Sequence, residues 1–521
     1  MRRPRARHSL AVAISPYTWQ MTDIRVRIAP SPTGPLHFGT ARTALFNFLF
    51  ARHTGGTFIL RLEDTDQARS TEAHELDIID GLHWLGIRWD EGPAVGDEPE
   101  RGDYGPYRQM QRMARYTEAA ARLLAEDKAY HCYCSPEELD AERRRQEAAH
   151  QASRYNGRCA NLSKAERAVF EAEGRKPVLR FRIPPDRKIA FDDIVRGHVE
   201  IDTSALGGDL VIVRSDGAPV FHFTVAVDDA AMAISHVIRG EDHLSNTPKH
   251  ILLFEAMGAE IPQFGHLPLI LNADRTKMSK RKSQTAVAAY RAQGFIPEGF
   301  VNYLALLGWS TGTEEEVISQ ADLVEKFDLS KVNSSGAIFD RERLEWLNGQ
   351  WIRRLSADDL IERLRPFMEI ELAAGRIDWL PSDAEMRALL PVVQERLPTL
   401  AAVGDLIGFI FVKDVDADPA LIVPKRWDPG TTATGLAAAR DTIAETGKTN
   451  WDAHEIEAPL RRLVEDRGWK AGDLFMAIRV AVTGRTATPP LFDTMVALGY
   501  ERTLARLDRA IEKLEAVAPS P

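Results

Sequence analysis

The sequence predicts an α/β core that is split by an inserted α+β domain and followed by an all-α C-terminal region. Three patterns predict this fold class: a strand, loop, helix, strand order near the N-terminus, a change of composition over residues 117–205, and amphipathic helical periodicity beyond residue 340. A chain of 521 residues is also too long for one hydrophobic core, because domains average about 150 residues.

The first pattern is a βαβ unit. Arg25–Pro30 has the character of a strand, which the following Pro- and Gly-rich turn ends. Ala41–Arg52 has apolar residues at helical spacing and stops at two glycines, and Thr57–Leu62 is again a strand. We expect a Rossmann-like core, whose ligands bind beyond the carboxyl ends of the parallel strands.

The insertion is indicated by a Glu- and Arg-rich helical stretch, three cysteines and a short strand at Val178–Arg182 that two prolines end. Strand-like patterns return at Asp209–Val213 and Ile234–Ile238, which we expect to complete the parallel sheet. The expected domains are a disordered extension at 1–20, the first half of the core at 21–116, the insertion at 117–205, the second half of the core at 206–274, a loop and helical domain at 275–340, and an all-helical region at 341–521.

Composition excludes several classes of protein. A hydrophobic fraction of 44% and a charged fraction of 27% are typical of globular domains. Three cysteines favour a reducing cytoplasm over a disulfide framework, and no run approaches the roughly 18 apolar residues of a membrane span. The net charge of -10 is a weak argument against an RNA partner, because binding depends on the local field.

Two short strings suit phosphate chemistry. In the first, His37 and Gly39 precede a helix, so that backbone N–H groups and an imidazole face an incoming nucleotide. In the second, residues 275–282 place five cations within eight positions, and pyrophosphate is a natural counter-charge for them. Taken singly, the first string is more often an ordinary loop histidine and the second a solvated basic loop or an RNA patch.

Together, the two strings resemble the HIGH and KMSKS signatures of class I aminoacyl-tRNA synthetases. In the first, Thr40 replaces the final histidine, which makes it a candidate phosphate donor. Further blocks are similar to glutamyl-tRNA synthetases of the bacterial type. These blocks are Arg27–Gly34, Arg61–Asp66, Gly105–Gln109, Val237–Leu244 and Asn302–Trp309.

The resemblance implies roles for individual residues. Glutamate contacts are expected from Arg27, Ala29, Ser31, Glu63, Phe221 and Arg239; ATP contacts from His37, Gly39, Asp242, Ile270 and Lys280; and catalysis, with Mg²⁺, from His37, Lys277 and Lys280. Either arginine of the glutamate pocket could bind either substrate carboxylate. The alternative for Glu63 is an acidic turn that caps a helix. Many relatives have tyrosine where this chain has Phe221, so His222 or water would replace a lost polar contact.

The cysteines suggest a metal site in the insertion. Cys132 and Cys134 are followed by Cys159, and some members of the family bind structural zinc with such a set. Asn161 stands where those members have histidine, so Tyr155 or a water would be the fourth ligand. The alternative, which stays open, is three buried thiols that pack as small apolar residues.

The helical third of the chain resembles the anticodon-binding region of the bacterial glutamyl enzymes, whereas the glutaminyl enzymes carry β-barrels there. Leu474–Arg485 and Pro489–Met495 carry that resemblance. Arg396 aligns with an arginine that reads the third anticodon base in relatives restricted to glutamate tRNA. The alternative is a surface arginine without such a role.

We therefore expect a monomeric cytoplasmic ligase that activates L-glutamate with ATP and transfers it to the 3'-terminal adenosine of tRNA(Glu). The family implies that the insertion binds the acceptor stem and that residues 275–340 contact the stem. Three alternatives are a small-molecule nucleotidyltransferase, a short paralogue that glutamylates a modified tRNA base, and a noncatalytic RNA-binding protein. The helical third disfavours the first two, and retention of His37, Lys277 and Lys280 disfavours the last.

Overall fold

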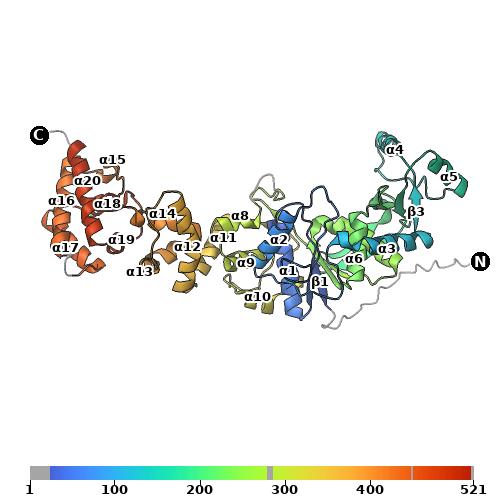
Figure 1. The fold of residues 1–521 in the computed structure, drawn as a ribbon, viewed down its shortest axis with the longest axis horizontal. Coiled ribbons are helices and arrows are strands. Elements are labelled where there is room, and N and C mark those ends of the chain that lie inside the picture. Colours follow the sequence, from blue (N-terminus) through green and yellow to red (C-terminus); the bar gives the residue numbers. More distant parts are fainter. Residues whose placement is uncertain (1–23, 279–284, 447–449, 518–521) are drawn as a thin grey trace, which may run out of the picture. The chain divides into compact units, whose positions relative to one another are not determined.

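The computed structural model describes residues 24–278, 285–446 and 450–517 (Figure 1). The chain divides into two compact units, Met1–Val287 with Leu304–Phe339, and Ala288–Tyr303 with Asp340–Pro521. The predicted domain of residues 275–340 falls partly in each unit. The other predicted boundaries stay predictions, and the predicted extension at 1–20 lies outside the described residues.

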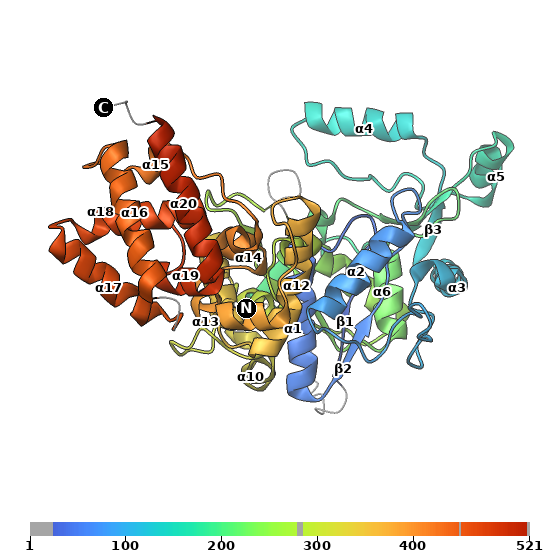
Figure 2. The ribbon, with the colours of Figure 1, turned by 60° about the vertical axis from the view of Figure 1, so that its left-hand side comes forward.

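The core of the first unit begins with the predicted βαβ unit. β1 (Arg25–Ile28) pairs in parallel with β2 (Thr57–Leu60), and α1 (Phe38–Thr54) packs against both strands (Figure 2). Gly55 ends α1 in the left-handed backbone region, with φ 67°, which is the role expected of a glycine at a helix C-terminus.

The second half of the core supplies two more parallel strands. β8 (His236–Gly240) pairs with β9 (Gln263–Leu267), and the Ser235 N–H donates to the Arg25 carbonyl, which sets β8 beside β1. The predicted return of the chain to the parallel sheet is therefore confirmed for β8.

The same prediction is wrong for the strand after residue 208. β7 (Leu210–Val213) pairs antiparallel with β4 (Val178–Phe181), which pairs in turn with β3 (Ala129–Cys132). Asp209 explains the difference, because its carboxylate accepts hydrogen bonds from the Tyr130 hydroxyl at 2.6 Å and the Ile183 N–H at 2.8 Å. These bonds hold β7 in the sheet of the insertion.

Two strands within the predicted insertion extend the core sheet instead. β5 (Lys188–Asp193) and β6 (Gly197–Asp202) form an antiparallel hairpin, and β5 pairs in parallel with β9 through Asp193 and Phe264. The insertion is therefore joined to the core at Asp193.

Helices and short strands complete the first unit. They are α2 (Glu72–Trp84), α3 (Met113–Ala125), α4 (Pro136–Ala148), α5 (Lys164–Ala172), α6 (Phe221–Ala231), α7 (Thr247–Met257), α10 (Gln320–Lys326), β10 (Ile270–Leu271), β11 (Ala337–Ile338) and the 3₁₀ helices η2 (Gln109–Arg112), η3 (Thr203–Leu206), η4 (Glu241–Asn246) and η5 (Leu329–Lys331).

The prediction of an all-helical C-terminal region is confirmed for the described part of the chain beyond residue 340. Its helices are α11 (Arg341–Ile352), α12 (Ala357–Ala373), α13 (Asp383–Val393), α14 (Val403–Ile407), α15 (Pro419–Ile422), α16 (Pro429–Thr446), α17 (Ala453–Asp466), α18 (Ala471–Thr483), α19 (Leu491–Leu498), α20 (Tyr500–Val517), and the 3₁₀ helices η6 (Gln394–Arg396), η7 (Leu400–Ala402) and η8 (Gly408–Phe411). α8 (Val287–Ala292) and α9 (Pro297–Leu306) each cross a unit boundary. Within the described ranges, no helix is long and apolar enough to cross a membrane.

A buried network of ion pairs joins β2, α6 and η2. The Arg61 guanidinium is fully buried and donates to Asp229 at 2.7 Å and to Glu63 at 3.1 Å, and its Nε lies 3.8 Å from Asp228. Asp228 also accepts a hydrogen bond from Arg112 at 2.6 Å. Buried charges are tolerated only when each is paired and hydrogen-bonded, so the members of this network depend on one another.

Replacing Asp228 with Asn is expected to destabilise the first unit by about 3–5 kcal/mol, because two buried guanidinium groups lose a charged partner. Urea unfolding of the full chain, followed by hydrogen–deuterium exchange of peptides from α6 and β2, measures this change. The matched control is Asp216→Asn on an exposed turn of the same unit, with an expected change below about 0.5 kcal/mol. A loss below about 1 kcal/mol for Asp228→Asn would contradict the dependence.

Candidate functional site

A cavity of about 540 Å³ opens beyond the carboxyl ends of β1 and β8, where the sequence predicts ligand binding. Its volume is typical of small-molecule sites. The described residues predicted for the core site all line it, namely Arg27, Ala29, Ser31, His37, Gly39, Glu63, Phe221, Arg239, Asp242, Ile270 and Lys277. Lys280 lies outside the described residues.

His37 is the N-cap of α1, and Thr40 fixes its imidazole. Nδ1 accepts from the Thr40 N–H at 3.2 Å, so Nε2 carries the proton and lies 2.9 Å from the Thr40 hydroxyl oxygen. The hydroxyl proton of Thr40 can then point toward a ligand. The first turn of α1 contains no acidic residue, which suits an anion at its N-terminus.

Glycine is needed at position 39 to keep the cavity open, and the backbone conformation there does not itself require a glycine. A methyl group at Gly39 would lie 3.4 Å from the His37 ring, an ordinary contact, and its backbone is not left-handed. Because Gly39 lines the cavity, a side chain there would occupy ligand space.

Lys277 forms the rim of the cavity with Asp242. Its ammonium lies 3.1 Å from the Asp242 carboxylate, and both side chains are about half exposed. Burial tends to raise the pKa of Asp242, but the Lys277 ammonium and the nearby His243 lower it below its ordinary value. The Met278 N–H donates to Ile270 at 3.0 Å, so the start of the basic loop folds back on β10.

Arg27 already has a carboxylate partner. Its Nε and Nη2 donate to the two carboxylate oxygens of Asp229 at 3.0 and 3.2 Å, in a buried bidentate pair. Asp229 is shared with Arg61, so Arg27 belongs to the ion network below the cavity.

Arg239 differs, because its hydrogen bonds go to neutral groups. Its guanidinium contacts His266, His250, the His243 carbonyl and the Thr247 hydroxyl at 2.9–3.3 Å. It forms no ion pair with the described carboxylates, whereas Arg27 and Arg61 both do. Burial lowers the pKa of Arg239 to about 9, so the group still carries its charge at neutral pH. The cavity therefore contains a buried cation that is ready for an anionic ligand.

Glu63 is buried at the floor of the cavity and accepts from Arg61. It follows β2 and does not cap α2, whose N-cap is Thr71, so the helix-capping alternative for Glu63 is wrong. Phe221 lines the cavity as predicted, but His222 does not replace a polar contact there, because its Nδ1 pairs with His250 at 3.2 Å.

Sequence reasoning missed Arg42. It is buried on the inner face of α1, lines the cavity and donates to the carbonyls of Pro268 and Leu307. Burial lowers its pKa to about 10. An arginine on a helix face whose other buried residues, apart from Asn47, are apolar was a signal that could have identified it.

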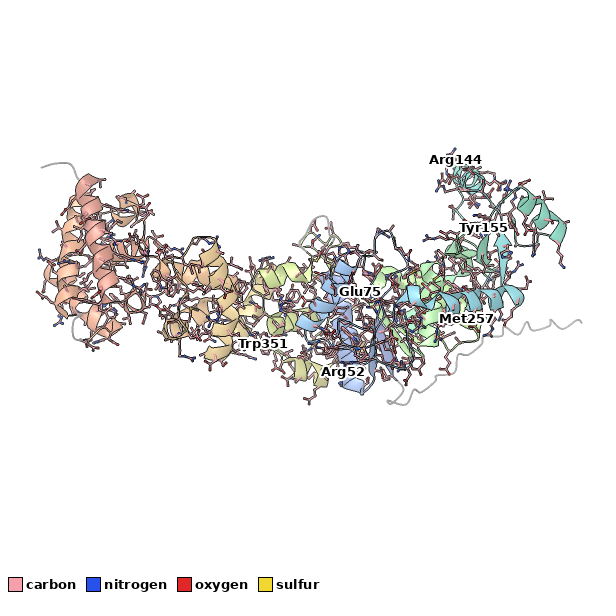
Figure 3. The ribbon with its side chains drawn as sticks, in the orientation of Figure 1. Arg52, Glu75, Arg144, Tyr155, Met257 and Trp351 are labelled. Atoms are coloured by element: carbon pink, nitrogen blue, oxygen red, sulfur yellow. The ribbon has the colours of Figure 1, made fainter. Side chains whose placement is uncertain are left out.

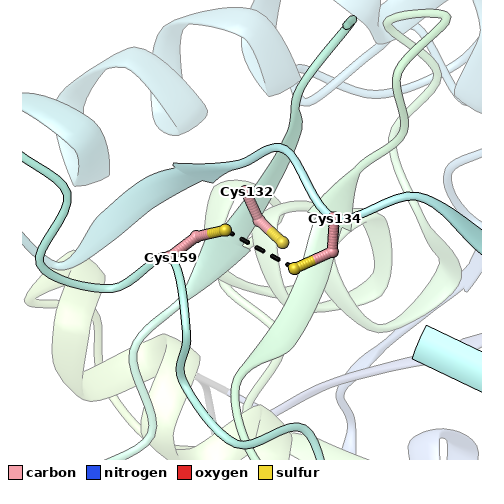
Figure 4. A group of neighbouring side chains, drawn as sticks. All are labelled: Cys132, Cys134 and Cys159. Atoms are coloured by element: carbon pink, nitrogen blue, oxygen red, sulfur yellow. Dashed lines mark hydrogen bonds between the residues drawn. The ribbon is translucent and has the colours of Figure 1, made fainter. Parts of the chain in front are cut away.

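The three cysteines come together in the insertion (Figure 4). Cys132 ends β3, Cys134 follows it, and Cys159 precedes α5. Their sulfur atoms all lie within 4.8 Å of one another. The hydroxyl of Tyr155, labelled in Figure 3, lies 3.3 Å from the Cys132 sulfur and 3.8 Å from the Cys134 sulfur. The four predicted ligands are thus neighbours, and the spacing fits a tetrahedral metal with three sulfur ligands.

Arg396 lies in the second unit, at the end of η6. Its side chain is exposed, and its Nη1 donates to the Val392 carbonyl at 2.7 Å. The side chain is accessible to a partner, and both predicted alternatives remain compatible with that position.

The chain matches two family models. Residues 23–346 match the catalytic domain of class I tRNA synthetases (E and Q), and residues 359–511 match an anticodon binding domain. The two matches together span most of the chain, and the cavity with its predicted residues lies within the first.

Curated relatives and a solved structure are similar over nearly the full length. The glutamate–tRNA ligase of Heliobacterium modesticaldum is 45% identical over 94% of this chain and 97% of its own, and that of Symbiobacterium thermophilum is 42% identical over 93% and 99%. A crystal structure of a glutamate tRNA ligase from Elizabethkingia meningosepticum, in complex with its amino acid, has a TM-score of 0.83 at 35% identity and covers 94% of this chain and 100% of that one.

The buried carboxyl of Glu63 leads to a prediction about stability and pH. Burial raises the pKa of Glu63 above its ordinary value, and the Arg61 charge offsets this in part. A carboxyl with a raised folded-state pKa stabilises the fold fully below its unfolded-state pKa and loses that contribution as pH rises through the folded-state pKa. Glu63→Gln should therefore raise the Tm at pH 8 by roughly 2–4 °C, and by less toward pH 5.

Thermal unfolding of the wild type and of Glu63→Gln at several pH values between 5 and 8 measures this effect. Glu118→Gln on the exposed face of α3 is the control and should change the Tm by less than about 1 °C at every pH. A lower Tm for Glu63→Gln at pH 8 would show that the ionised carboxylate stabilises the fold.

Proposed function

The chain belongs to the class I tRNA synthetases for glutamate and glutamine, and within them to the glutamate–tRNA ligases, and we propose here how its cavity performs the reaction. Arg239 carries the proposal, because it is a buried, charged guanidinium whose partners are all neutral. Its charge is offset when a substrate carboxylate binds.

Glutamate is held between opposite charges in this proposal. Arg239 attracts one carboxylate of the substrate, and the buried Glu63 carboxylate at the cavity floor is placed for the α-ammonium group. Arg27 contributes through its N–H groups, since Asp229 already balances its charge. A substrate with a neutral amide in place of the side-chain carboxylate is attracted less strongly by the Arg239 charge. The site therefore binds glutamate in preference to glutamine.

ATP lies on the side of His37 and Gly39. The N-terminus of α1, the His37–Thr40 pair and the ammonium of Lys277 offer donors and positive charge to phosphate oxygens. We assign Lys280 to the same role on the basis of its place in the basic string. Mg²⁺ enters with the nucleotide, because that ion is usually held by phosphates, waters and one or two carboxylates, and Asp242 is the carboxylate on this rim.

The reaction has two steps. An oxygen of the glutamate α-carboxylate attacks the α-phosphorus of ATP, the bond to the β-phosphate oxygen breaks, and pyrophosphate leaves. A ribose hydroxyl of the 3'-terminal adenosine of tRNA(Glu) then attacks the acyl carbon, the bond to AMP breaks, and the hydroxyl proton leaves with AMP. Orientation and charge stabilisation supply the catalysis, since no protein nucleophile is needed.

The tRNA contacts are proposed for the insertion, for residues 275–340 and for the second unit. The match of residues 359–511 to an anticodon binding domain supports the last of these, and the exposed Arg396 lies within that match. We propose that Arg396 contacts the anticodon. We also propose that the protein acts as a monomer in the cytoplasm, a compartment that suits its three free cysteines.

Arg239→Ala tests the proposed function. In aminoacylation of tRNA(Glu), the variant is expected to raise the KM for glutamate by about 100-fold or more, because truncating one partner of a buried charged contact costs several kcal/mol. The KM for ATP should change little, and the preference for glutamate over glutamine should fall.

The matched control is Lys249→Ala, which removes a half-buried positive charge of the same unit that does not line the cavity. Its KM for glutamate should stay within about twofold of the wild type. An Arg239→Ala enzyme with wild-type KM for glutamate would refute the assignment, as would a wild-type enzyme that charges tRNA with glutamine.

The second part of the proposal is structural zinc in the insertion, held by Cys132, Cys134, Cys159 and Tyr155. Three sulfur atoms within 4.8 Å and a phenol oxygen beside two of them match the donor set that zinc prefers. The bound metal would tie β3 to the segment before α5. These two segments are otherwise joined by a small apolar cluster and by the contacts of Tyr155 with the cysteine sulfur atoms.

Elemental analysis of the full chain purified with zinc is expected to find about one zinc per molecule. Cys134→Ala should lower this content strongly, and Tyr155→Phe should weaken zinc retention against a chelator while the ring still stacks on Arg180. A metal-free wild type, with Cys134→Ala as stable as the wild type, would favour the three buried thiols.

A further inference from the structure

The neutral partners of Arg239 form a cradle with a defined arrangement of protons. Arg239 Nε donates to His266 Nε2 at 3.2 Å, and Nη2 donates to the Thr247 hydroxyl oxygen at 2.9 Å. A guanidinium has only donors, so each of these atoms must accept. Because the Thr247 oxygen accepts from Arg239, its own proton is left to donate to His266 Nε2, which lies 3.1 Å away.

These contacts fix the tautomer of His266. Two donors meet at Nε2, so Nε2 bears the lone pair and Nδ1 bears the proton. Nδ1 lies 2.6 Å from the Asp193 carboxylate, which accepts that proton in a hydrogen bond. Both side chains are fully buried. Burial and the Arg239 charge lower the pKa of His266 by more than the Asp193 carboxylate raises it, which agrees with the neutral imidazole that the two donors at Nε2 require.

Backbone hydrogen bonds orient the Asp193 carboxylate toward His266. Its Oδ1 accepts from the backbone N–H groups of Val195, Arg196 and His266 at 2.9–3.1 Å, so this oxygen is committed to the turn after β5 and to β9. Its Oδ2 is directed at the imidazole. The hydrogen-bonded path from this carboxylate to Arg239 therefore runs through His266.

We propose that Asp193 and His266 are positioning residues for glutamate recognition: Asp193 holds His266 in the tautomer whose Nε2 accepts from Arg239, and this fixes the guanidinium at the cavity without neutralising it. The inference rests on the proposed role of Arg239 as the carboxylate receptor. A carboxylate placed directly on Arg239 would cancel the charge that the substrate needs. An imidazole between the two groups supplies the geometry and leaves the charge available.

His250 repeats the arrangement on the other side of the guanidinium. Its Nδ1 accepts from Arg239 at 3.2 Å, so its Nε2 bears the proton and donates to His222 Nδ1 at 3.2 Å. Burial lowers the pKa of His222 to about 4 and that of His250 well below its ordinary value. Both imidazoles are thus neutral acceptors.

Asp193→Asn tests the proposal with a near-isosteric change. The asparagine oxygen keeps the three backbone N–H bonds, so its amide N–H group faces His266 Nδ1, which must then accept. His266 Nε2 then becomes protonated. An N–H donor now faces the Arg239 and Thr247 donors, so the hydrogen bonds to Nε2 are lost. The expected result in aminoacylation is a rise of about 10-fold in the KM for glutamate, with the KM for ATP within about twofold.

Asp192→Asn is the matched control. Asp192 is the preceding residue of β5 and also pairs with a histidine, His198 at 2.8 Å, but both side chains are exposed. This variant removes the same charge from the same strand and should leave the KM for glutamate unchanged. An equal rise in both variants would overturn the proposal.

A double-mutant cycle separates positioning from a purely structural role. In His266→Gln, the side-chain oxygen can accept from Arg239 but has no tautomer to set, so adding Asp193→Asn should change the KM for glutamate by less than about twofold. If the role of Asp193 is purely structural, Asp193→Asn raises the KM for glutamate equally in the wild type and in His266→Gln. That outcome overturns the proposal.

Two comparisons distinguish a failure of the proposed function of Arg239 from a failure of the positioning role of Asp193. If Arg239→Ala leaves the KM for glutamate unchanged, the proposed function of Arg239 fails. If Arg239→Ala raises that KM while Asp193→Asn does not, only the positioning role fails. Should Asp193→Asn not fold, His266→Gln is compared with His266→Phe, which offers no acceptor: the proposal requires a higher KM for glutamate in the Phe variant, and equal values overturn it.

Discussion

Arg61 lies fully buried beneath the cavity, and three carboxylates surround its guanidinium. A charge in the interior is stable only when its partners are held in place, so this contact constrains everything attached to it. Asp229 and Asp228 bring α6 to the end of β2, Arg27 follows through Asp229, and Glu63 is drawn to the floor of the cavity. Buried ion pairs therefore hold the floor of the cavity in place.

The cavity depends on a contrast between two buried arginines. Arg27 is neutralised by Asp229, and its contribution to a ligand is geometric. Arg239 is surrounded by histidines and a threonine, which accept its hydrogen bonds but give it no ion-pair partner. Such a group costs stability in the free protein and is compensated when an anion binds, which is a common exchange at binding sites. Asp193 supports the arrangement through His266 and forms no ion pair with the guanidinium itself.

The sequence predicts the part of this site that short strings carry. His37, Gly39 and Lys277 lie in motifs whose residue types and spacing suit phosphate binding, and the helical third follows from periodicity. Asp229 and Asp193 were not predicted, because each acts on a partner far away in the chain, 202 residues from Arg27 in one case and 73 from His266 in the other. The pairing of strands in the sheets was predicted wrongly for the same reason. The apolar run at Leu210–Val213 identifies β7 as a strand but contains no information on which strand pairs with it, and β5 (Lys188–Asp193) was not predicted at all.

Recognition of glutamate in this cavity depends on Arg239, whose guanidinium has no ion-pair partner in the described part of the chain and receives a carboxylate of the substrate. A crystal structure of the full chain with glutamate bound tests it most directly. We expect a carboxylate oxygen of glutamate within about 3 Å of the Arg239 guanidinium, with the Arg27–Asp229 pair intact. A glutamate whose carboxylates both bind elsewhere, with Arg27 released from Asp229 to hold one of them, would contradict it.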